Sequence, residues 1–105
     1  DYPVICFMQM EDLGFCKKGQ AAEFVRNHSL ETDGTFPHNT SGGQLSAGQA
    51  GAAGGYLGLV EAVRQVTNSA GPTQVENAET ALVSGFGMIN FDRGLCSGAA
   101  IIASA

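Results

Sequence analysis

Two histidines and three cysteines carry the proton-transfer and nucleophilic chemistry that this sequence could perform. An imidazole titrates near neutral pH and can move a proton, and His38 is the better candidate because it stands directly before the turn-forming run 39–43. His28 is expected in an exposed polar loop, as a solvated side chain. Cys96 could be a reacting thiol or a small buried hydrophobe beside a strand, and both readings stay open.

Gln49 lies in the run Ser46–Gly55, in which eight of ten residues are Gly or Ala. A carboxamide has no accessible pKa near neutrality, so Gln49 cannot serve as a general base. Its N–H can donate to a carbonyl oxygen or a developing oxyanion, assisted by the positive end of the helix expected to follow. Alternatively, it is an ordinary polar residue that satisfies a loop carbonyl.

Local signals predict two helices in the first part of the chain. Pro3, the apolar run Val4–Met8, Met10 and Leu13 predict a buried helix of about three turns, which Gly14 ends. The spacing of apolar residues predicts a second, shorter helix over 20–26. The polar residues 27–36 are expected to form an exposed loop.

The second part of the chain should contain a long helix and two strands. Small residues followed by apolar residues at helical spacing predict one helix over 46–66, whose first third packs against the strands. Unbroken apolar runs at 81–83 and 99–103 predict strands buried on both faces, with a glycine-bounded loop over 85–98 between them. Helices and paired strands together predict an α/β layer.

Composition narrows the possible functions. The 105 residues carry a formal charge of -5, with 10 acidic and 5 basic residues and no basic patch, which disfavours nucleic acid as a partner. The longest apolar stretch, Val4–Met8, is far shorter than the roughly 20 residues of a membrane span. The three cysteines have no Cys-x-x-Cys spacing, so we expect neither a disulfide framework nor a metal site, and a cytoplasmic location. Because the chain begins at Asp1 without Met, we expect upstream sequence.

Three ordered motifs, Glu11–Val25, Asn39–Gly43 and Ser46–Gly55, resemble the C-terminal part of thiolase-like proteins. The nearest branch is the sterol-carrier-protein-x type, which includes acetyl-CoA acetyltransferases and nonspecific lipid-transfer proteins. The resemblance covers essentially the whole chain. It implies an α/β fold with helices packed on a small mixed sheet. It also implies that residues 1–105 are one partial domain, separated from the first half that carries the nucleophilic cysteine.

The resemblance also implies roles for particular residues. Gln49 occupies the place of the family's active-site histidine, and Ala50 that of the following proline. A family cysteine with an acid–base role corresponds either to Cys96 or, in another register, to Ser84. The implied substrate-binding residues are Asn39, Ser41, Gly42, Gly43 and Gly48, because the glycines leave room for a coenzyme A chain, while Asn39 and Ser41 either orient substrate or pin the loop. His38 is a further candidate on the chemistry of its imidazole, in a place where the family usually has an aliphatic residue.

The implied activity is acyl-CoA-dependent acyl transfer or carbon–carbon cleavage in a full-length protein of lipid metabolism, with this segment inactive alone. Acyl-CoA is then the substrate, and no covalent cofactor is needed. The alternative is a noncatalytic acyl-CoA-binding or lipid-binding protein, or an interface subunit. In that case the histidine was lost together with the catalytic activity. Expected partners are a second copy, a thiolase-like subunit or a small subunit with zinc-ribbon and OB-type domains.

Overall fold

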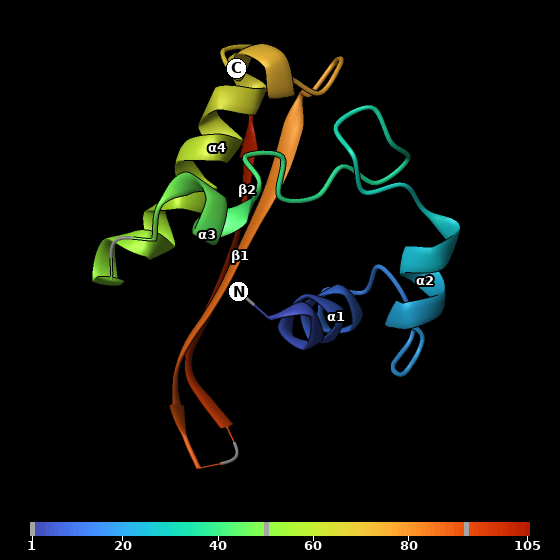
Figure 1. Cartoon of the computed structure of the whole chain (residues 1–105), viewed down its shortest axis with the longest axis vertical. Coiled ribbons are helices and arrows are strands. Elements are labelled where there is room, and N and C mark those ends of the chain that lie inside the picture. Colours follow the sequence, from blue (N-terminus) through green and yellow to red (C-terminus); the bar gives the residue numbers. More distant parts are fainter. Residues whose placement is uncertain (1, 50, 92) are drawn as a thin grey trace.

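The computed structural model describes residues 2–49, 51–91 and 93–105. Helices precede a C-terminal β-hairpin (Figure 1), which confirms the α/β class. In chain order the elements are α1 (Pro3–Asp12), α2 (Ala21–Asn27), α3 (Gly43–Ala47), the 3-10 helix η1 (Gly51–Gly55), α4 (Tyr56–Val66), the 3-10 helix η2 (Gly71–Thr73), β1 (Thr80–Asn90) and β2 (Arg93–Ala103).

The two N-terminal helices form where the sequence predicts them. Pro3 opens α1, and Gly14 follows the end of the helix with a left-handed φ of 85° that suits glycine. The expectation that α1 is buried is wrong, because Met10 is its buried residue while Val4 and Met8 are 60% and 51% exposed. The apolar surface of α1 is therefore only partly covered within this chain.

An aromatic cluster joins the segment that follows α1, helix α2 and the loop after α2. The ring of Phe36 meets those of Phe15 and Phe24 edge-on, at centroid distances of 4.9 and 5.0 Å. His28 stacks on Phe24 at 4.1 Å, and its Nδ1 lies 2.8 Å from the backbone oxygen of Phe24. The prediction that His28 is a solvated loop residue is therefore wrong. It caps α2 and is half-buried among aromatic rings.

The single helix predicted over 46–66 is also wrong. The helical path ends at Gly48, which has a left-handed φ of 98° and donates its N–H to the backbone oxygen of Gln44. A 3-10 turn follows, and α4 begins only at Tyr56. Each glycine costs an α-helix about 1 kcal/mol relative to alanine, and this run has few side chains to bury in compensation.

The two strands form a long antiparallel hairpin, with Thr80 opposite Ala103 and Asn90 opposite Arg93. The loop predicted over 85–98 is wrong, since Gly85 pairs with Gly98 inside the ladder. The turn lies at the tip, where Phe91 has a left-handed φ of 55° of the kind that tight hairpin turns require. Ladder pairing thus continues through glycines that looked like loop boundaries.

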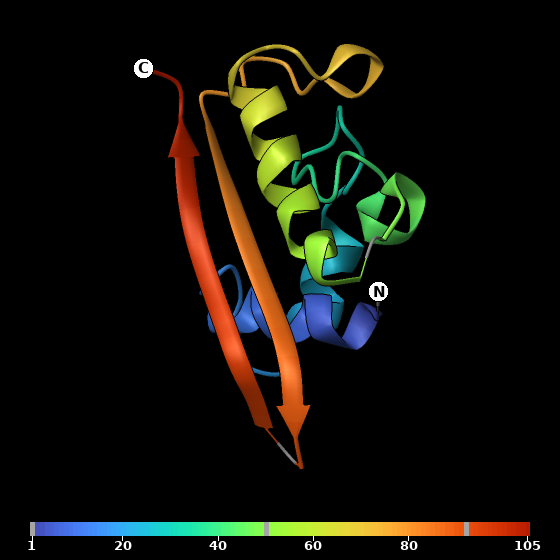
Figure 2. The ribbon, with the colours of Figure 1, turned by 90° about the vertical axis from the view of Figure 1, so that its left-hand side faces the viewer.

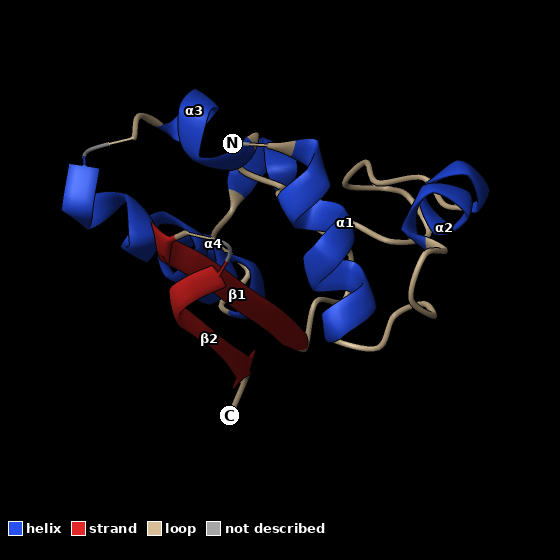
Figure 3. Cartoon of the chain, turned by 90° about the horizontal axis from the view of Figure 1, so that it is seen from below, coloured by secondary structure: helices blue, strands red, loops and turns tan. Residues whose placement is uncertain are grey.

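The helices lie on one side of the hairpin (Figure 2), and β1 is nearer to them than β2 (Figure 3). It is α4 that packs on β1, not the first third of the predicted long helix. Gly58 permits the approach, since a Cβ there would lie 3.3 Å from Cγ1 of Val83. The next residue of β1, Ser84, donates a hydrogen bond of 2.6 Å to Oε1 of Gln9, which links the sheet to α1.

The far face of the hairpin is open. Residues 95–101 are all exposed, with Leu95 at 55% and Ile101 at 75%. The expectation that both strands are buried on two faces is therefore wrong for this chain. Its surface of 7329 Å² exceeds the roughly 5,500 Å² expected of a compact 10.8-kDa monomer.

Among the described residues, no helix combines the length and the apolar character that crossing a membrane would require.

Candidate functional site

The loop between the aromatic cluster and α3 makes a tight turn. Asn39 has a left-handed φ of 51°, which asparagine tolerates better than most residues. The N–H of Gly42 donates to the backbone oxygen of Asn39 over 2.7 Å and closes the turn. Gly42 is itself left-handed, with φ of 87°, and no Cβ would fit there, because it would lie 2.8 Å from Cβ of Ser46.

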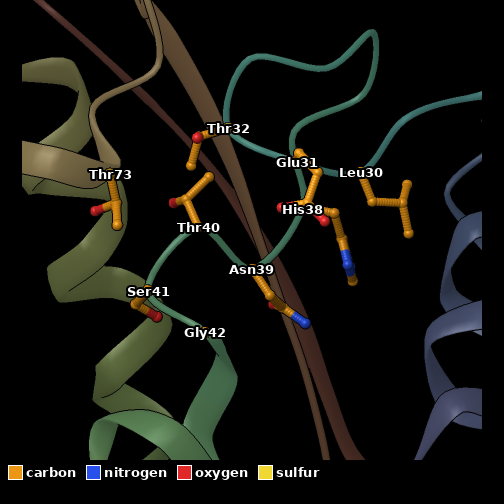
Figure 4. A pocket seen from close by; sticks show the side chains of 9 residues that line it. All are labelled: Leu30, Glu31, Thr32, His38, Asn39, Thr40, Ser41, Gly42 and Thr73. Atoms are coloured by element: carbon orange, nitrogen blue, oxygen red, sulfur yellow. The ribbon is translucent and has the colours of Figure 1, made fainter.

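This turn forms one wall of a pocket of about 360 Å³. Residues 30–32 and Thr73 of η2 line the rest of the pocket (Figure 4). The pocket contains four of the predicted substrate-binding residues. Its lining residues are Leu30, Glu31, Thr32, His38, Asn39, Thr40, Ser41, Gly42 and Thr73.

The imidazole of His38 is half-buried at the edge of this pocket. Its ring is nearly parallel to that of Phe36, with an interplanar angle of 14° and a centroid distance of 6.4 Å. Burial lowers the pKa of His38 below its ordinary value of 6.5, because removal from water disfavours the charged ring. At neutral pH the pocket therefore presents a neutral imidazole, which can donate or accept a hydrogen bond.

Behind the pocket lies a polar network that the sequence did not predict. The hydroxyl of Thr40 donates to Oε1 of Glu61 over 2.7 Å, and Nε2 of Gln65 donates to the same oxygen over 2.9 Å. Gln65 also donates to the backbone oxygen of Thr73 over 2.7 Å. The spacing of apolar residues predicted a helix here, but the residues that α4 buries are Glu61, Ala62 and Gln65. The signal that could have revealed the network is the pairing of Glu61 and Gln65 four residues apart, on one helix face.

The other predicted loop residues lie beside the pocket, outside its lining. Gly43 begins α3 and Gly48 ends it. The side chain of Gln49 is exposed, and its Nε2 lies 3.4 Å from Oε1 of Gln44. Ala50, predicted in the family's proline place, lies outside the described residues.

Ser84 and Cys96, the alternative acid–base residues, lie on the hairpin instead of in a loop. Ser84 is opposite Ala99 on β2, with its hydroxyl bonded to Gln9. Cys96 is opposite Gly87 and exposed. Neither lines the pocket that contains His38 and Asn39.

Within residues 2–49, 51–91 and 93–105, no group of three or more His, Cys, Asp or Glu side chains is arranged to hold a metal ion. Cys6, Cys16 and Cys96 are unbridged thiols. Burial is the main cause that raises the pKa of Cys16, with the nearby carboxylate of Glu11 adding to it. A thiol with a raised pKa is a weaker nucleophile at neutral pH.

The sequence matches the family described as "Thiolase C-terminal domain-like" over residues 1–96, which include the pocket, the polar network and most of the hairpin. The chain therefore belongs to this family, as its three motifs indicated. The matched range also includes the segment 46–66, so the break in the predicted helix does not count against membership.

Named relatives fall into two groups. The chain is 43% identical over 59 residues to a 17-hydroxy-3-oxo-4-pregnene-20-carboxyl-CoA lyase of Mycobacterium tuberculosis, covering 56% of this chain and 14% of the relative. It is 45% identical over 58 residues to a steroid side-chain-cleaving aldolase of Thermomonospora curvata, covering 55% and 14%. It is 35% identical over 80 residues to an acetyl-CoA acetyltransferase of Methanothermobacter thermautotrophicus, covering 76% and 21%.

The matches thus span about a seventh to a fifth of the length of these relatives. No solved structure matches the chain significantly.

Proposed function

We propose that this chain is the C-terminal part of a larger thiolase-like enzyme that binds an acyl-CoA thioester and makes or breaks an acyl or carbon–carbon bond. The observation that carries the proposal is the family match over residues 1–96, which includes the whole pocket wall 38–42. Relatives named as a CoA lyase, an aldolase and an acetyltransferase support the same substrate class. On this proposal residues 1–105 form one partial domain, and they are inactive alone.

The pocket chemistry suits a thioester better than a charged phosphate. Its wall offers the Asn39 carboxamide, the Ser41 hydroxyl and the His38 imidazole. The charged residue among its described lining residues is Glu31, whose carboxylate would repel a phosphate, and no lysine or arginine is among them. Its volume is at the lower end of the range for small-molecule sites, so the acyl end of the ligand fits it better than an entire coenzyme A. Gly43 and Gly48 leave open backbone along which the rest of the ligand can lie, whereas the space beside Gly42 is taken by the side chain of Ser46.

In acyl transfer and in retro-aldol cleavage alike, negative charge develops on the thioester oxygen, and N–H donors stabilise it. Gln49 is proposed as such a donor, because it can give a hydrogen bond but cannot move a proton. Cys96 or Ser84 is proposed as the acid–base group near the reacting carbon. These three side chains come from separate elements, so the proposal requires the rest of the enzyme to complete the site around them.

The test is an assay of the whole protein with two classes of substrate. A 3-ketoacyl-CoA with free CoA tests thiolysis, and a 3-hydroxyacyl-CoA tests retro-aldol cleavage, with the shortened acyl-CoA measured by chromatography. We expect one class to turn over and Asn39→Ala to lower kcat/KM by about 10²-fold, the scale of a lost positioning contact. Absence of turnover with both classes would reject the enzyme.

A noncatalytic acyl-CoA-binding or lipid-binding protein is the second candidate, favoured by a glutamine in the family's histidine place. It predicts calorimetric binding of acyl-CoA without turnover, and loss of that binding in Asn39→Ala. The two candidates differ in turnover alone, so both measurements belong in the same experiment.

The proposed context is lipid metabolism in the cytoplasm, in a homo-oligomer or in a complex with a thiolase-like subunit or a small zinc-ribbon/OB-type subunit. The open face of the hairpin supports an association of this kind. Size-exclusion chromatography of the whole protein, alone and with the product of any neighbouring zinc-ribbon gene, separates these possibilities.

A further inference from the structure

Helix α4 buries two polar side chains, Glu61 at 7% and Gln65 at 5% exposure. Among the residues whose burial is described, the buried apolar side chains are Met10, Ala21, Ala62 and Ala70. Burying a carboxylate and a carboxamide is unfavourable unless their hydrogen bonds are satisfied. Part of this small core is therefore polar. The hydrogen-bond partners of Glu61 and Gln65 show which segments the pair holds.

Both polar atoms of the Gln65 side chain, Oε1 and Nε2, form hydrogen bonds. Its Oε1 accepts from the backbone N–H of Val75 over 2.8 Å and from Nε2 of Gln74 over 3.2 Å. Its Nε2 has two hydrogens, and the two nearest acceptors are the backbone oxygen of Thr73 at 2.7 Å and Oε1 of Glu61 at 2.9 Å. The hydroxyl of Thr40 lies 3.1 Å from the same nitrogen.

Glu61 is satisfied on both oxygens. Oε1 receives the hydroxyl of Thr40 over 2.7 Å, and Oε2 receives Nη1 of Arg64 over 2.9 Å. Arg64 is fixed in turn by a bond of 3.0 Å from Nη2 to the backbone oxygen of Ala70. The guanidinium compensates the buried charge, so the pair does not place a net negative charge behind the pocket.

The network contacts the pocket wall at two points from different segments. Thr40 belongs to the loop that carries Asn39 and Ser41, and Thr73 belongs to η2 (Figure 4). Gln65 reaches both, within 3.1 and 2.7 Å. One buried side chain of α4 thus sets the separation of two walls that are more than thirty residues apart in sequence.

We propose that Gln65 and Glu61 are positioning residues: from behind the pocket they hold Thr40 and Thr73 in place and so fix where Asn39 and Ser41 meet the substrate. The inference rests on the proposed function for its effect on turnover, and on the hydrogen bonds alone for its effect on the loop. Neither side chain lines the pocket.

The experiment compares Gln65→Met, which keeps length but removes every hydrogen bond, with Ala62→Gly in the whole protein. Ala62 is buried on the same helix but belongs to no part of the network, so its replacement destabilises α4 without releasing Thr40. At a temperature where both variants are folded, Gln65→Met should lower kcat/KM about 10–100-fold. Amide exchange in residues 38–48 should also become faster. Ala62→Gly should lower the melting temperature but stay within about twofold of wild type in both readouts.

If Gln65→Met does not fold, Glu61→Gln is compared with Ala62→Gly instead. Whichever way the new amide turns, it places N–H groups against either Arg64 or the Thr40–Gln65 pair, and so breaks the network on one side. Unchanged exchange in residues 38–48 overturns the inference, whatever the activity. Faster exchange with unchanged kcat/KM also overturns it. Faster exchange in a protein whose wild type turns over no acyl-CoA supports the positioning of the loop and rejects the proposed function.

Discussion

His38 combines a half-buried imidazole with a place in the pocket wall, and its titration is coupled to folding. Burial lowers the pKa of His38 in the folded chain below the ordinary value of 6.5, so the fold favours the neutral ring. Below that pH the unfolded chain takes up the proton first, so the free energy of unfolding decreases as the pH falls. Above it, this contribution is constant.

We therefore expect the wild-type chain to lose stability relative to His38→Leu as pH falls through about 6.5. Urea denaturation of both proteins between pH 5.5 and 8 measures the difference. The carboxylates are common to both proteins, so their titration cancels. A difference in stability that does not change with pH would show that His38 does not titrate differently in the two states.

The role of Gln49 distinguishes an active enzyme from a protein that has lost its catalytic activity. Replacement by Ala in the whole protein should lower turnover by about 10²–10³, the scale of one lost oxyanion donor, with acyl-CoA affinity nearly unchanged. In this chain the carboxamide is exposed and lies near Gln44, so on the proposed function a donor role would require covering groups from outside residues 1–105. Stopped-flow turnover and calorimetric binding test the two halves of the prediction. Intact turnover would leave Gln49 a structural residue.

At the level of elements, the turn before α3 depends on glycine. Gly42→Ala would combine an unfavourable left-handed backbone, about 1–2 kcal/mol, with a Cβ 2.8 Å from that of Ser46. Gly14→Ala is the matched control, since its φ of 85° is similar but nothing lies within 4 Å of the added Cβ. We expect Gly42→Ala to lose roughly 1–3 kcal/mol more than Gly14→Ala in chemical denaturation, the range for a forced overpacking. Equal losses would mean that Ser46 moves aside freely.

Elements with local signals were predictable from sequence, and those that depend on distant partners were not. Pro3 and Gly14 bound α1 because each acts through its own backbone. The break at Gly48 was missed because periodicity counts apolar side chains and not left-handed backbone. The hairpin was predicted too short, because its pairing continues through Gly85 and Gly98 once the flanking residues are in register.

The candidate site also combines residues that were predictable from local sequence with residues that were not. Four residues of the pocket wall, His38, Asn39, Ser41 and Gly42, were named as candidates because they stand in or directly before one contiguous motif. Glu61 and Gln65 were missed because their partner Thr40 lies 21 and 25 residues away, and nothing in the helical pattern reports that contact. A buried polar pair becomes recognisable only when the groups that satisfy it are known.

For the whole molecule, the excess exposed surface predicts association. Apolar residues of β2 and α1 are open to solvent, and contiguous apolar patches beyond a few hundred Å² drive contacts. We expect the isolated chain to form dimers or larger species at tens of micromolar, measured by light scattering. Ile101→Glu, at a residue 75% exposed on the open face, should shift the population toward monomer. Val60→Glu on α4 is the control and should shift it less, and a monodisperse wild-type monomer would contradict the prediction.

The order of the elements along the chain also sets the order in which they become available during synthesis. The partners of Gln65 at 73–75 follow it within ten residues, whereas the hairpin on which α4 packs ends only at Ala103. At about 5–20 residues per second, the ribosome needs roughly 2–7 s to add the hairpin once α4 has been made. During that interval the rear wall of the pocket can assemble while the sheet side of α4 has no partner. A nascent chain from which Val75 but not the hairpin has emerged from the ribosome is therefore expected to form the contacts of Gln65, while the sheet-facing side of α4 stays accessible to a chaperone.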